Sequence, residues 1–284
     1  MKSVKKPRND IFDDLYEEFK LIRDDKRSFN RKYRIEESEC FFRAINKIYR
    51  LYGYLSILYM IENHDEFPTC KIMNKEIIDL YENHIVRGRG RNIYDELKSL
   101  PDIDLCPFCN NRPVATLDHY LPKSNYTTYA IIPNNLVGCC EACNTVKGNQ
   151  FSNKADEQLF HPYYDDFDAV RWLYATVKEG DAPSINFFVK INDSLYVDLE
   201  KRVIKNFEVF NLNKLYCILS AQELSGIVGQ LKRINERNKI KRLLWDRYDS
   251  ERQNDMNHWK TALYEALYKN DWYCSGGYMK FKRI

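Results

Sequence analysis

Two pairs of cysteines constrain the fold of this chain more than any other feature of its 284 residues. Each pair has the spacing Cys-x-x-Cys: Cys106 is paired with Cys109, and Cys140 with Cys143. Four thiolates are the ligand set of a closed tetrahedral zinc site, and two such pairs in one chain are typical of that site. The sequence therefore predicts one structural zinc ion, with the segment between the pairs folded around it.

The gap between the two pairs is long. Thirty residues separate Cys109 from Cys140, whereas about 15–20 are usual in four-cysteine zinc sites, so the pairs should enclose more than a zinc ribbon. Cys139 adjoins Cys140 and competes with it as a ligand. Their side chains would point to opposite faces of a strand, and the Cys-x-x-Cys spacing selects Cys140. The competing interpretation, four ordinary buried thiols, does not account for the spacing.

Polar residues that zinc binding does not require lie inside this segment. Residues 114–119 have the character of a short strand that ends in Asp118 and His119, and residues 135–139 that of a second strand. Residues 141–148 have the character of a short helix that ends at a glycine. Two strands and a helix closed by zinc should bring Asp118 close to that helix.

The predicted helix carries two of the polar residues. Asn144 and Lys147 are three residues apart, so their side chains should share one helix face. Asp118 and Asn144 offer oxygen ligands, which suit a hard cation such as Mg²⁺. His119 offers a nitrogen that titrates near neutral pH. These residue types together indicate an active site rather than a zinc scaffold alone.

On these residues, the segment from Cys106 to Lys147 resembles an HNH endonuclease domain, from the zinc-stapled branch of the ββα-metal nucleases. The resemblance covers the chain from Cys106 to Pro162. It covers the rest of the chain weakly, although the tripeptide His161-Pro162-Tyr163 is similar to a segment often found downstream in bacterial HNH proteins. It implies a fold in which two strands and a helix surround a catalytic metal ion.

The resemblance also implies a role for each polar residue. His119 would be the general base, and Asp118 and Asn144 would hold a catalytic Mg²⁺ or Mn²⁺ ion. Asn135 would orient the loop that carries the histidine, with Asn134 as the alternative. The implied activity is metal-dependent hydrolysis of phosphodiester bonds, with DNA as the expected substrate.

Three further residues have two interpretations each. Lys147 and Lys123 could contact backbone phosphates as point charges, or they could be solvated surface residues, which is the favoured interpretation for Lys123. His161 could approach the active site, although a His-Pro step is more often a turn element.

The predicted fold class is α+β and mostly helical. A zinc-bound ββα-metal nuclease core at residues 101–164 is flanked by a helical N-terminal region, residues 1–100, and by a C-terminal region, residues 165–284, that combines a β-hairpin with helices. A chain of this length can form one large or two medium domains.

Apolar residues at helical spacing support the helical flanks. The expected buried stripes are Phe12, Leu15, Tyr16, Phe19 and Ile22 in one helix, and Phe41, Ile45, Ile48, Tyr52 and Leu55 in the next. In the C-terminal region we expect strands within residues 170–178 and 184–191, and helices at 214–247 and 250–268, the last with Ser250 as its N-cap.

The charge balance bears on nucleic-acid binding. The net charge is only +3, and residues 101–164 hold four Lys and Arg against six Asp and Glu. A metal ion can offset this acidity, and DNA affinity would then come from basic clusters at residues 20–34, 87–91 and 232–242. The competing interpretation is a solvated charged face or, for residues 87–91, a flexible linker.

The sequence argues against a membrane protein or an exported one. The start of the chain lacks the apolar stretch of a signal peptide. The most apolar run, residues 51–61, has 11 residues, whereas a membrane helix needs about 20, so we expect a buried helix there. Unpaired cysteines beside a zinc site fit a reducing cytoplasm.

Three functions remain open from the sequence. The first is a metal-dependent HNH endonuclease that acts on DNA. The second is a zinc-stabilised nucleic-acid-binding module without catalytic activity, which would have no use for Asp118, His119 and Asn144 together. The third refines the first: the layout is similar to the HNH subunits of bacterial two-gene anti-phage systems, which implies an ATPase partner that delivers or activates the nuclease.

Overall fold

The computed structural model describes residues 1–23, 30–62, 70–168, 170–191 and 197–281. The chain forms two compact units, residues 1–166 and 167–284. Its class is α+β and mostly helical, with two small antiparallel sheets of two strands each among the described residues. Part of the predicted basic cluster at residues 20–34 lies outside the described residues.

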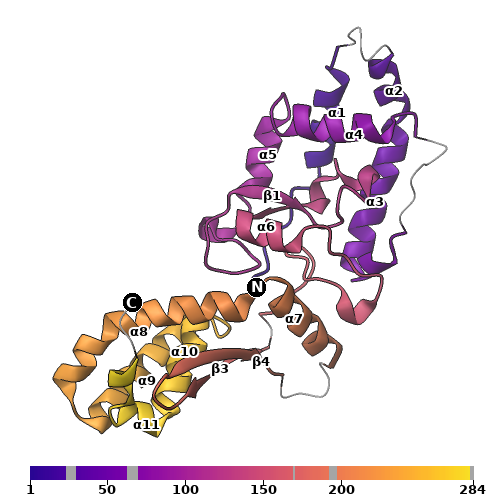
Figure 1. Cartoon of the computed structure of the whole chain (residues 1–284). Helices are drawn as coiled ribbons and strands as arrows, with labels where there is room; N and C mark the ends of the chain where they lie inside the picture. Colours follow the sequence, from indigo (N-terminus) through magenta and orange to yellow (C-terminus); the bar gives the residue numbers. More distant parts are fainter. Residues whose placement is uncertain (24–29, 63–69, 169, 192–196, 282–284) are drawn as a thin grey trace. The chain divides into compact units, whose positions relative to one another are not determined.

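The first unit contains six of the labelled helices and one sheet (Figure 1). Its elements are α1 (Ile11–Lys20), α2 (Arg31–Glu37), α3 (Glu39–Tyr54), α4 (Asn74–Asp79), α5 (Arg91–Lys98), β1 (Thr116–His119), β2 (Leu136–Cys139) and α6 (Glu141–Lys147). Between α4 and α5 the chain makes a short π-helix, Leu80–Ile85.

The helix α1 follows its apolar pattern, because the predicted stripe from Phe12 to Phe19 is buried. The buried face of α3 is different from the predicted one. Phe42 and Tyr49 are buried together with Ile45, whereas Leu55 is 57% exposed and lies beyond the end of the helix. Apolar residues occupy adjacent positions in this helix, so helical spacing alone could not choose between the two faces. The prediction of a buried helix at residues 51–61 was wrong.

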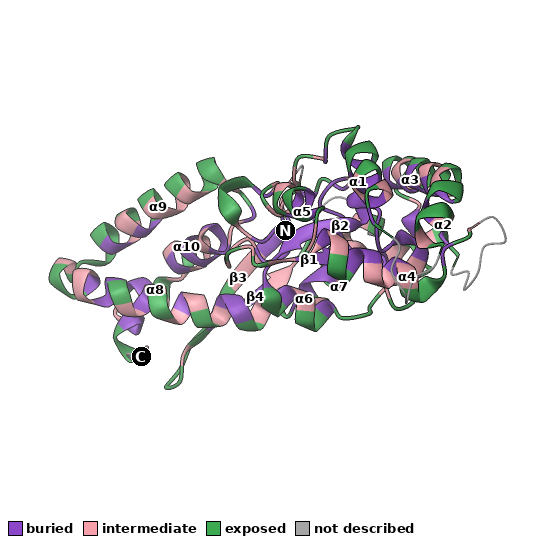
Figure 2. Ribbon diagram, turned by 90° about the horizontal axis from the view of Figure 1, so that it is seen from above, coloured by how far each residue is buried: buried purple, intermediate pink, exposed green. Residues whose placement is uncertain are grey.

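The predicted order of strand, strand and helix is present after residue 114. β1 pairs with β2 in antiparallel register, with Thr116 opposite Cys139 and His119 opposite Leu136. The two strands are almost entirely buried (Figure 2), and α6 packs against β1. Gly148 ends α6 in a positive-φ conformation, with φ of 51°, that favours glycine.

The second unit is a β-hairpin covered by helices. Its elements are β3 (Leu173–Lys178), β4 (Ser184–Val189), α7 (Val197–Val209), α8 (Leu212–Ile234), α9 (Arg237–Asn254), α10 (Trp259–Lys269) and α11 (Asp271–Cys274). The predicted hairpin is confirmed, with Leu173 opposite Val189 and Lys178 opposite Ser184. β3 packs against α10, and β4 packs against α8.

The helices of the second unit break at other places than the sequence predicted. The expected helix at residues 214–247 is divided, because Asn235 takes the left-handed conformation and ends α8. Ser250 lies inside α9 and is not an N-cap. The break falls instead before Asn257, whose side-chain oxygen accepts hydrogen bonds from the backbone nitrogens of Trp172 and Leu173, at 2.8 and 3.3 Å. This tertiary role of Asn257 decides where the chain turns.

Among the described residues, no helix combines the length and apolar character needed to cross a membrane.

Candidate functional site

The four predicted cysteines meet in one cluster. The Sγ atoms of Cys106, Cys109, Cys140 and Cys143 all lie within 4.8 Å of one another, and all four residues are buried. Sulfurs placed about 2.3 Å from a central zinc ion would be about 3.8 Å apart, and the sulfurs of Cys109 and Cys140 are 4.0 Å apart. The cluster could therefore hold zinc. Cys139 is not part of it, and burial raises the pKa of its thiol.

Local backbone geometry forms both turns of the cysteine cluster. After the first pair, Asn110 adopts the left-handed conformation with φ of 47°, and its backbone nitrogen donates to the carbonyl of Cys106 at 2.8 Å. The second pair begins α6, where Cys140 is the N-cap and its sulfur accepts a hydrogen bond from the backbone nitrogen of Cys143 at 3.4 Å. The helix thus begins at a cluster cysteine and carries Asn144 one residue beyond the last cysteine.

A pocket of about 380 Å³ opens beside this cluster. It brings together three of the predicted residues, Asp118, His119 and Asn144, and the predicted Lys123 is also part of its wall. The full lining is Tyr81, Val86, Tyr94, Thr116, Leu117, Asp118, His119, Pro122, Lys123, Asn144, Gly148 and Asn149.

The side chain of His119 is held in one orientation. Its Nε2 atom lies 3.1 Å from the backbone oxygen of Ala130, and a carbonyl can only accept, so Nε2 carries a proton. Burial lowers the pKa of His119 to about 3, so the ring is neutral at pH 7 and Nδ1 is an acceptor. Among the described residues, no group hydrogen-bonds to Nδ1. The ring of Tyr81 packs edge-on against the imidazole, with centroids 4.4 Å apart.

Asp118 is paired with a buried lysine. The Nζ atom of Lys147 lies 2.9 Å from Oδ2 of Asp118 and donates hydrogen bonds to Oδ1 at 3.2 Å and to the backbone oxygen of His119 at 2.7 Å. Burial raises the pKa of Asp118, and the charge of Lys147 opposes that shift. The ammonium group, which the sequence suggested for phosphate contact, therefore faces Asp118 rather than solvent.

The Oδ2 atom of Asp118 is buried, and despite its proximity to Lys147 no group among the described residues donates a well-aligned hydrogen bond to it. Asn144, on the adjacent wall of the pocket, is partly exposed, and its side-chain amide makes no hydrogen bond to another described residue. The Asn144 amide is thus open to a further ligand, whereas Oδ2 of Asp118 is buried with the ammonium group of Lys147 2.9 Å away.

Lys123 lies at the edge of the pocket. Its Nζ atom is 2.7 Å from a carboxylate oxygen of Glu82, and the side chain is 37% exposed. The same ammonium group lies 5.2 Å from the centre of the Tyr81 ring. Lys123 is thus an ion-paired surface residue that remains within reach of the solvent.

Asn135 is the centre of a buried hydrogen-bond network. Its side-chain oxygen accepts from the backbone nitrogen of Leu121 at 2.7 Å and from the hydroxyl of Tyr49 at 3.0 Å. Its amide nitrogen donates to the backbone oxygens of Leu121 and Tyr129, at 3.1 and 3.0 Å. These bonds tie down the loop that follows His119. The neighbouring Asn134 is buried as well.

His161 belongs to the same network. Its Nδ1 accepts from the backbone nitrogen of Tyr163 at 3.2 Å, so Nε2 of the neutral ring donates to the hydroxyl of Tyr49 at 3.0 Å. His161 is buried and does not line the pocket. It supports Asn135 through Tyr49 and lies outside the pocket that contains His119.

Sequence reasoning missed the residues that the N-terminal helices contribute. Tyr81, Val86 and Tyr94 line the pocket, and Tyr49 reaches Asn135 from α3. Tyr81 lies on the π-helix, a rare geometry that is frequent at functional sites. A signal in the sequence was the Arg-Gly repeat at residues 87–91, which follows directly after this segment.

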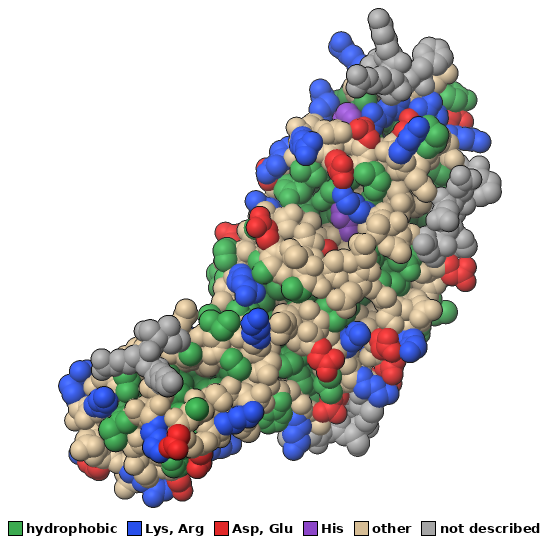
Figure 3. Space-filling model, viewed as in Figure 1, with side chains coloured by type: hydrophobic (Ala, Val, Ile, Leu, Met, Phe, Trp, Pro, Cys, Tyr) green, Lys and Arg blue, Asp and Glu red, His purple; other side chains and the backbone are tan. Residues whose placement is uncertain are grey.

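The predicted basic clusters are ion-paired in part. At the start of α9, Lys239 pairs with Glu236, Arg242 with Asp246, and Lys241 with Asp271. Figure 3 shows Lys and Arg side chains on the surface with Asp and Glu among them.

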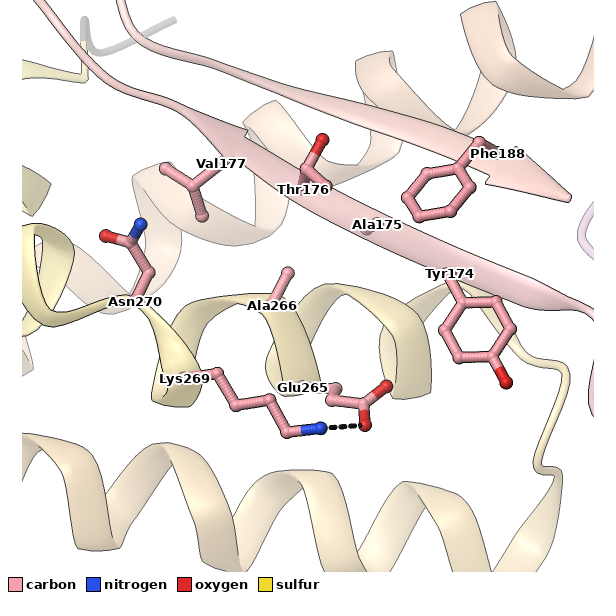
Figure 4. Close-up of a pocket in the computed structure, with 9 residues that line it drawn as sticks. All are labelled: Tyr174, Ala175, Thr176, Val177, Phe188, Glu265, Ala266, Lys269 and Asn270. Carbon is pink, nitrogen blue, oxygen red and sulfur yellow. Dashed lines mark hydrogen bonds and ion pairs between the residues drawn. The ribbon is translucent and has the colours of Figure 1, made fainter. Parts of the chain in front are cut away.

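A second pocket, of about 360 Å³, lies in the second unit between β3 and α10 (Figure 4). Ala175 of β3 and Ala266 of α10 line it, and its two charged groups, Glu265 and Lys269, form an ion pair of 2.6 Å with each other. It is a shallow apolar groove whose charges are already neutralised.

Comparison with known proteins finds one phage protein with detectable similarity. The chain is 26% identical over 227 residues to protein ea31 of Escherichia phage lambda, and the match covers 72% of this chain and 76% of the phage protein. No family model matches the chain, and no solved structure matches it. The case for a function therefore rests on the site itself.

Proposed function

We propose that this chain is a metal-dependent endonuclease of the HNH type, which hydrolyses phosphodiester bonds in DNA. The observation that carries the proposal is the hydrogen bond from Nε2 of His119 to the backbone of Ala130. It makes Nδ1 the proton acceptor of a histidine whose pocket is also lined by Asp118 and Asn144. A positioned base beside oxygen ligands is what hydrolysis of a phosphodiester requires.

The donor set of the pocket fits a divalent cation. The carboxylate of Asp118 lines the pocket with Lys147 as its counter-ion, 2.9 Å from Oδ2, and the Asn144 amide lines the same pocket without a hydrogen bond to another described residue. Mg²⁺ is usually held by one or two carboxylates together with substrate phosphates and water, so Asp118 and Asn144 would hold it or Mn²⁺. When bound, the metal would supply positive charge that stabilises the transition state of phosphoryl transfer.

The residues of the chain move the proton and hold the geometry. Nδ1 of His119 takes a proton from a water molecule while the water oxygen forms its bond to phosphorus. The bond between phosphorus and the leaving oxygen breaks, and that oxygen takes up a proton from the solvent. The bond to Ala130 and the ring of Tyr81 keep the imidazole in one orientation.

The cysteine cluster would act as a structural zinc site rather than a catalytic one. All four of its positions are protein thiolates, and a closed tetrahedral site leaves no position for water or substrate. Its place in the mechanism is to hold the start of α6, and with it Asn144, against β1.

The test is a cleavage assay with the purified full-length chain. Supercoiled plasmid and labelled DNA and RNA oligonucleotides are incubated with Mg²⁺ or Mn²⁺, with and without a chelator. Cleavage of DNA that stops when the chelator is added would support the proposal, and preferential cleavage of RNA would revise the substrate. Tight DNA binding without cleavage under any metal would favour the non-catalytic binding module instead.

A protein partner is part of the proposal because the sequence layout resembles ATPase-paired HNH subunits of anti-phage systems. A chain that is inactive alone, but cuts DNA when the ATPase from the neighbouring gene and ATP are added, would support this paired form. Full activity of the isolated chain, unchanged by the ATPase, would argue against it.

A further inference from the structure

The π-helix Leu80–Ile85 forms one wall of the pocket. Its wide turn is seen in the hydrogen bond from the backbone nitrogen of Val86 to the oxygen of Tyr81, five residues earlier, at 2.9 Å. π-Helical turns are uncommon and are frequently found at functional sites. Here the turn brings both Tyr81 and Val86 to the pocket. The segment thus joins the N-terminal helices to the site of His119.

The Arg-Gly loop after this turn is fixed rather than a flexible linker. A Cβ atom on Gly88 would lie 2.5 Å from the backbone oxygen of Asn83, so only glycine fits there. The backbone nitrogen of Gly90 donates to the oxygen of His84 at 2.9 Å. Arg91 donates to the oxygen of Val86 at 3.0 Å. These contacts hold the loop against the π-helix.

The three arginines of this loop differ in their partners. Arg89 pairs with Glu18 at 2.9 Å, and Arg91 pairs with Asp95 at 2.9 Å. Arg87 is exposed, and among the described residues it forms no ion pair. It directly follows Val86, which lines the pocket. Arg87 is thus a cation without an ion-pair partner among the described residues, next in sequence to a pocket residue, and is available to an anionic ligand.

The hydroxyl of Tyr81 is a second group that can bind a ligand. Its side chain is 7% exposed and lines the pocket, yet its hydroxyl makes no hydrogen bond to another described residue. Burial raises the pKa of this hydroxyl, so it stays protonated and can donate. The ring itself is already engaged, since it packs on the imidazole of His119 at 4.4 Å.

We propose that the segment from Tyr81 to Arg87 grips the sugar-phosphate backbone of a polynucleotide beside the reacting phosphate. The Tyr81 hydroxyl donates a hydrogen bond to a phosphate oxygen in the pocket, and the Arg87 guanidinium pairs with a neighbouring phosphate at its rim. This inference rests on the proposed nuclease function and deepens it, because it assigns substrate binding to the N-terminal helical region rather than to the slightly acidic core.

The test measures binding separately from cleavage. The full-length His119→Ala chain, which should not cut, is titrated against a fluorescein-labelled DNA duplex at several salt concentrations, and its slope of log affinity against log salt is the reference. Arg87→Ala in this background should reduce the slope by about 0.9, the value for one lost phosphate contact. Lys47→Ala is the control, because this lysine is exposed on α3 and no residue of α3 lines the pocket.

Tyr81→Phe separates the hydroxyl from the ring. Phenylalanine keeps the packing on His119, so the chain should fold normally. The loss of a hydrogen bond to a charged oxygen costs about 1.5–3 kcal/mol, which corresponds to a loss of DNA affinity of about tenfold or more. In the otherwise wild-type chain, Arg87→Ala should raise KM for DNA cleavage while kcat changes little.

The two proposals fail in different ways. If Arg87→Ala and Lys47→Ala give the same slope, or the parent chain does not bind DNA, the grip is refuted, whatever the cleavage assay shows. If the wild-type chain does not cut DNA either alone or with the ATPase and ATP, but Arg87→Ala still lowers the salt slope, the nuclease proposal fails and the proposed DNA contact is supported.

Discussion

The ammonium nitrogen of Lys147 lies 2.9 Å from Oδ2 of Asp118, and both side chains are at least 95% buried. Lys147 belongs to α6 and Asp118 to β1, so the pair joins the helix to the strand that carries His119. Buried ion pairs are costly to break, because removal of one partner leaves an uncompensated charge away from water. Removal of either charge should therefore change both the free energy of unfolding of this region and the charge at the site.

Lys147→Met should destabilise the chain by about 3–5 kcal/mol, since it leaves Asp118 buried without its counter-charge. The measurement is urea unfolding at neutral pH in the presence of zinc. The double variant Asp118→Asn/Lys147→Met should lose less than the two single variants combined, because the two residues act as a unit. Strictly additive losses would contradict a coupled pair.

Divalent metal should rescue the variant that lacks the lysine. If Asp118 can hold Mg²⁺ or Mn²⁺, either ion should raise the melting temperature of Lys147→Met more than that of the wild-type chain, because binding to the folded state stabilises it. The control is Asp118→Asn/Lys147→Met, which should gain much less. An equal rise in melting temperature for all three chains would show that the metal does not bind at Asp118.

His119→Ala should reduce DNA cleavage by about 10²–10⁴-fold, the usual contribution of a general base. The matched control is His258→Ala, in the second unit, where the side chain lies near Glu251 and far from the pocket in sequence. Circular dichroism should show both variants folded. Cleavage by folded His119→Ala at the wild-type rate would refute the assignment of the base.

The folded chain should contain one zinc ion held by the four clustered cysteines. Cys140→Ser should remove the zinc and lower the melting temperature sharply, because structural zinc contributes folding free energy directly. Cys139→Ser changes the neighbouring residue, whose thiol is outside the cluster, and should be mild. Elemental analysis of both variants is the measurement, and the reverse ranking would show that the neighbouring cysteine is the ligand.

Asn135→Ala should destabilise the chain by at least about 2 kcal/mol, because it leaves buried donors and acceptors of Leu121 and Tyr129 without partners. Tyr49→Phe removes two hydrogen bonds of the same network, the one donated to Asn135 and the one accepted from His161, and should cost less, about 1–2 kcal/mol. Unfolding in urea measures both. A larger effect for Tyr49→Phe would mean that the network is centred on Tyr49 and His161 instead.

The cysteine cluster and the elements beside it could be predicted because their signals are short sequence motifs. The spacing of Cys106, Cys109, Cys140 and Cys143 fixes which sulfurs can meet, and an apolar run ending in Asp118 and His119 fixes the strand. The helix then carries Asn144 to the same pocket, as expected from its position after the last cysteine. Each motif spans a few residues, and the shared ligand spacing of the two cysteine pairs is what links them across the thirty residues between.

The other features of the site depend on packing between segments that are distant in the sequence, and the spacing of apolar residues carries no information about such packing. Tyr49 and Tyr81 join the site from far upstream, and neither has a motif. The shared helix face of Asn144 and Lys147 was foreseeable, but the partner of the lysine was not, since burial against Asp118 decides it. The break at Asn235 likewise depends on one left-handed residue within the segment predicted as a single helix, residues 214–247.

The bond between Tyr49 and Asn135 has a consequence for how this chain can be divided or recombined. A fragment that starts at residue 101 keeps the cysteine cluster and the residues of β1 and α6, yet it loses the hydroxyl that completes the network of Asn135 and the ring that packs on His119. The residues from 101 onward are therefore not expected to form the complete site by themselves. An ancestor or an engineered fusion that transfers it must carry residues 1–166 together, so the N-terminal helices and the core should be inherited as one piece.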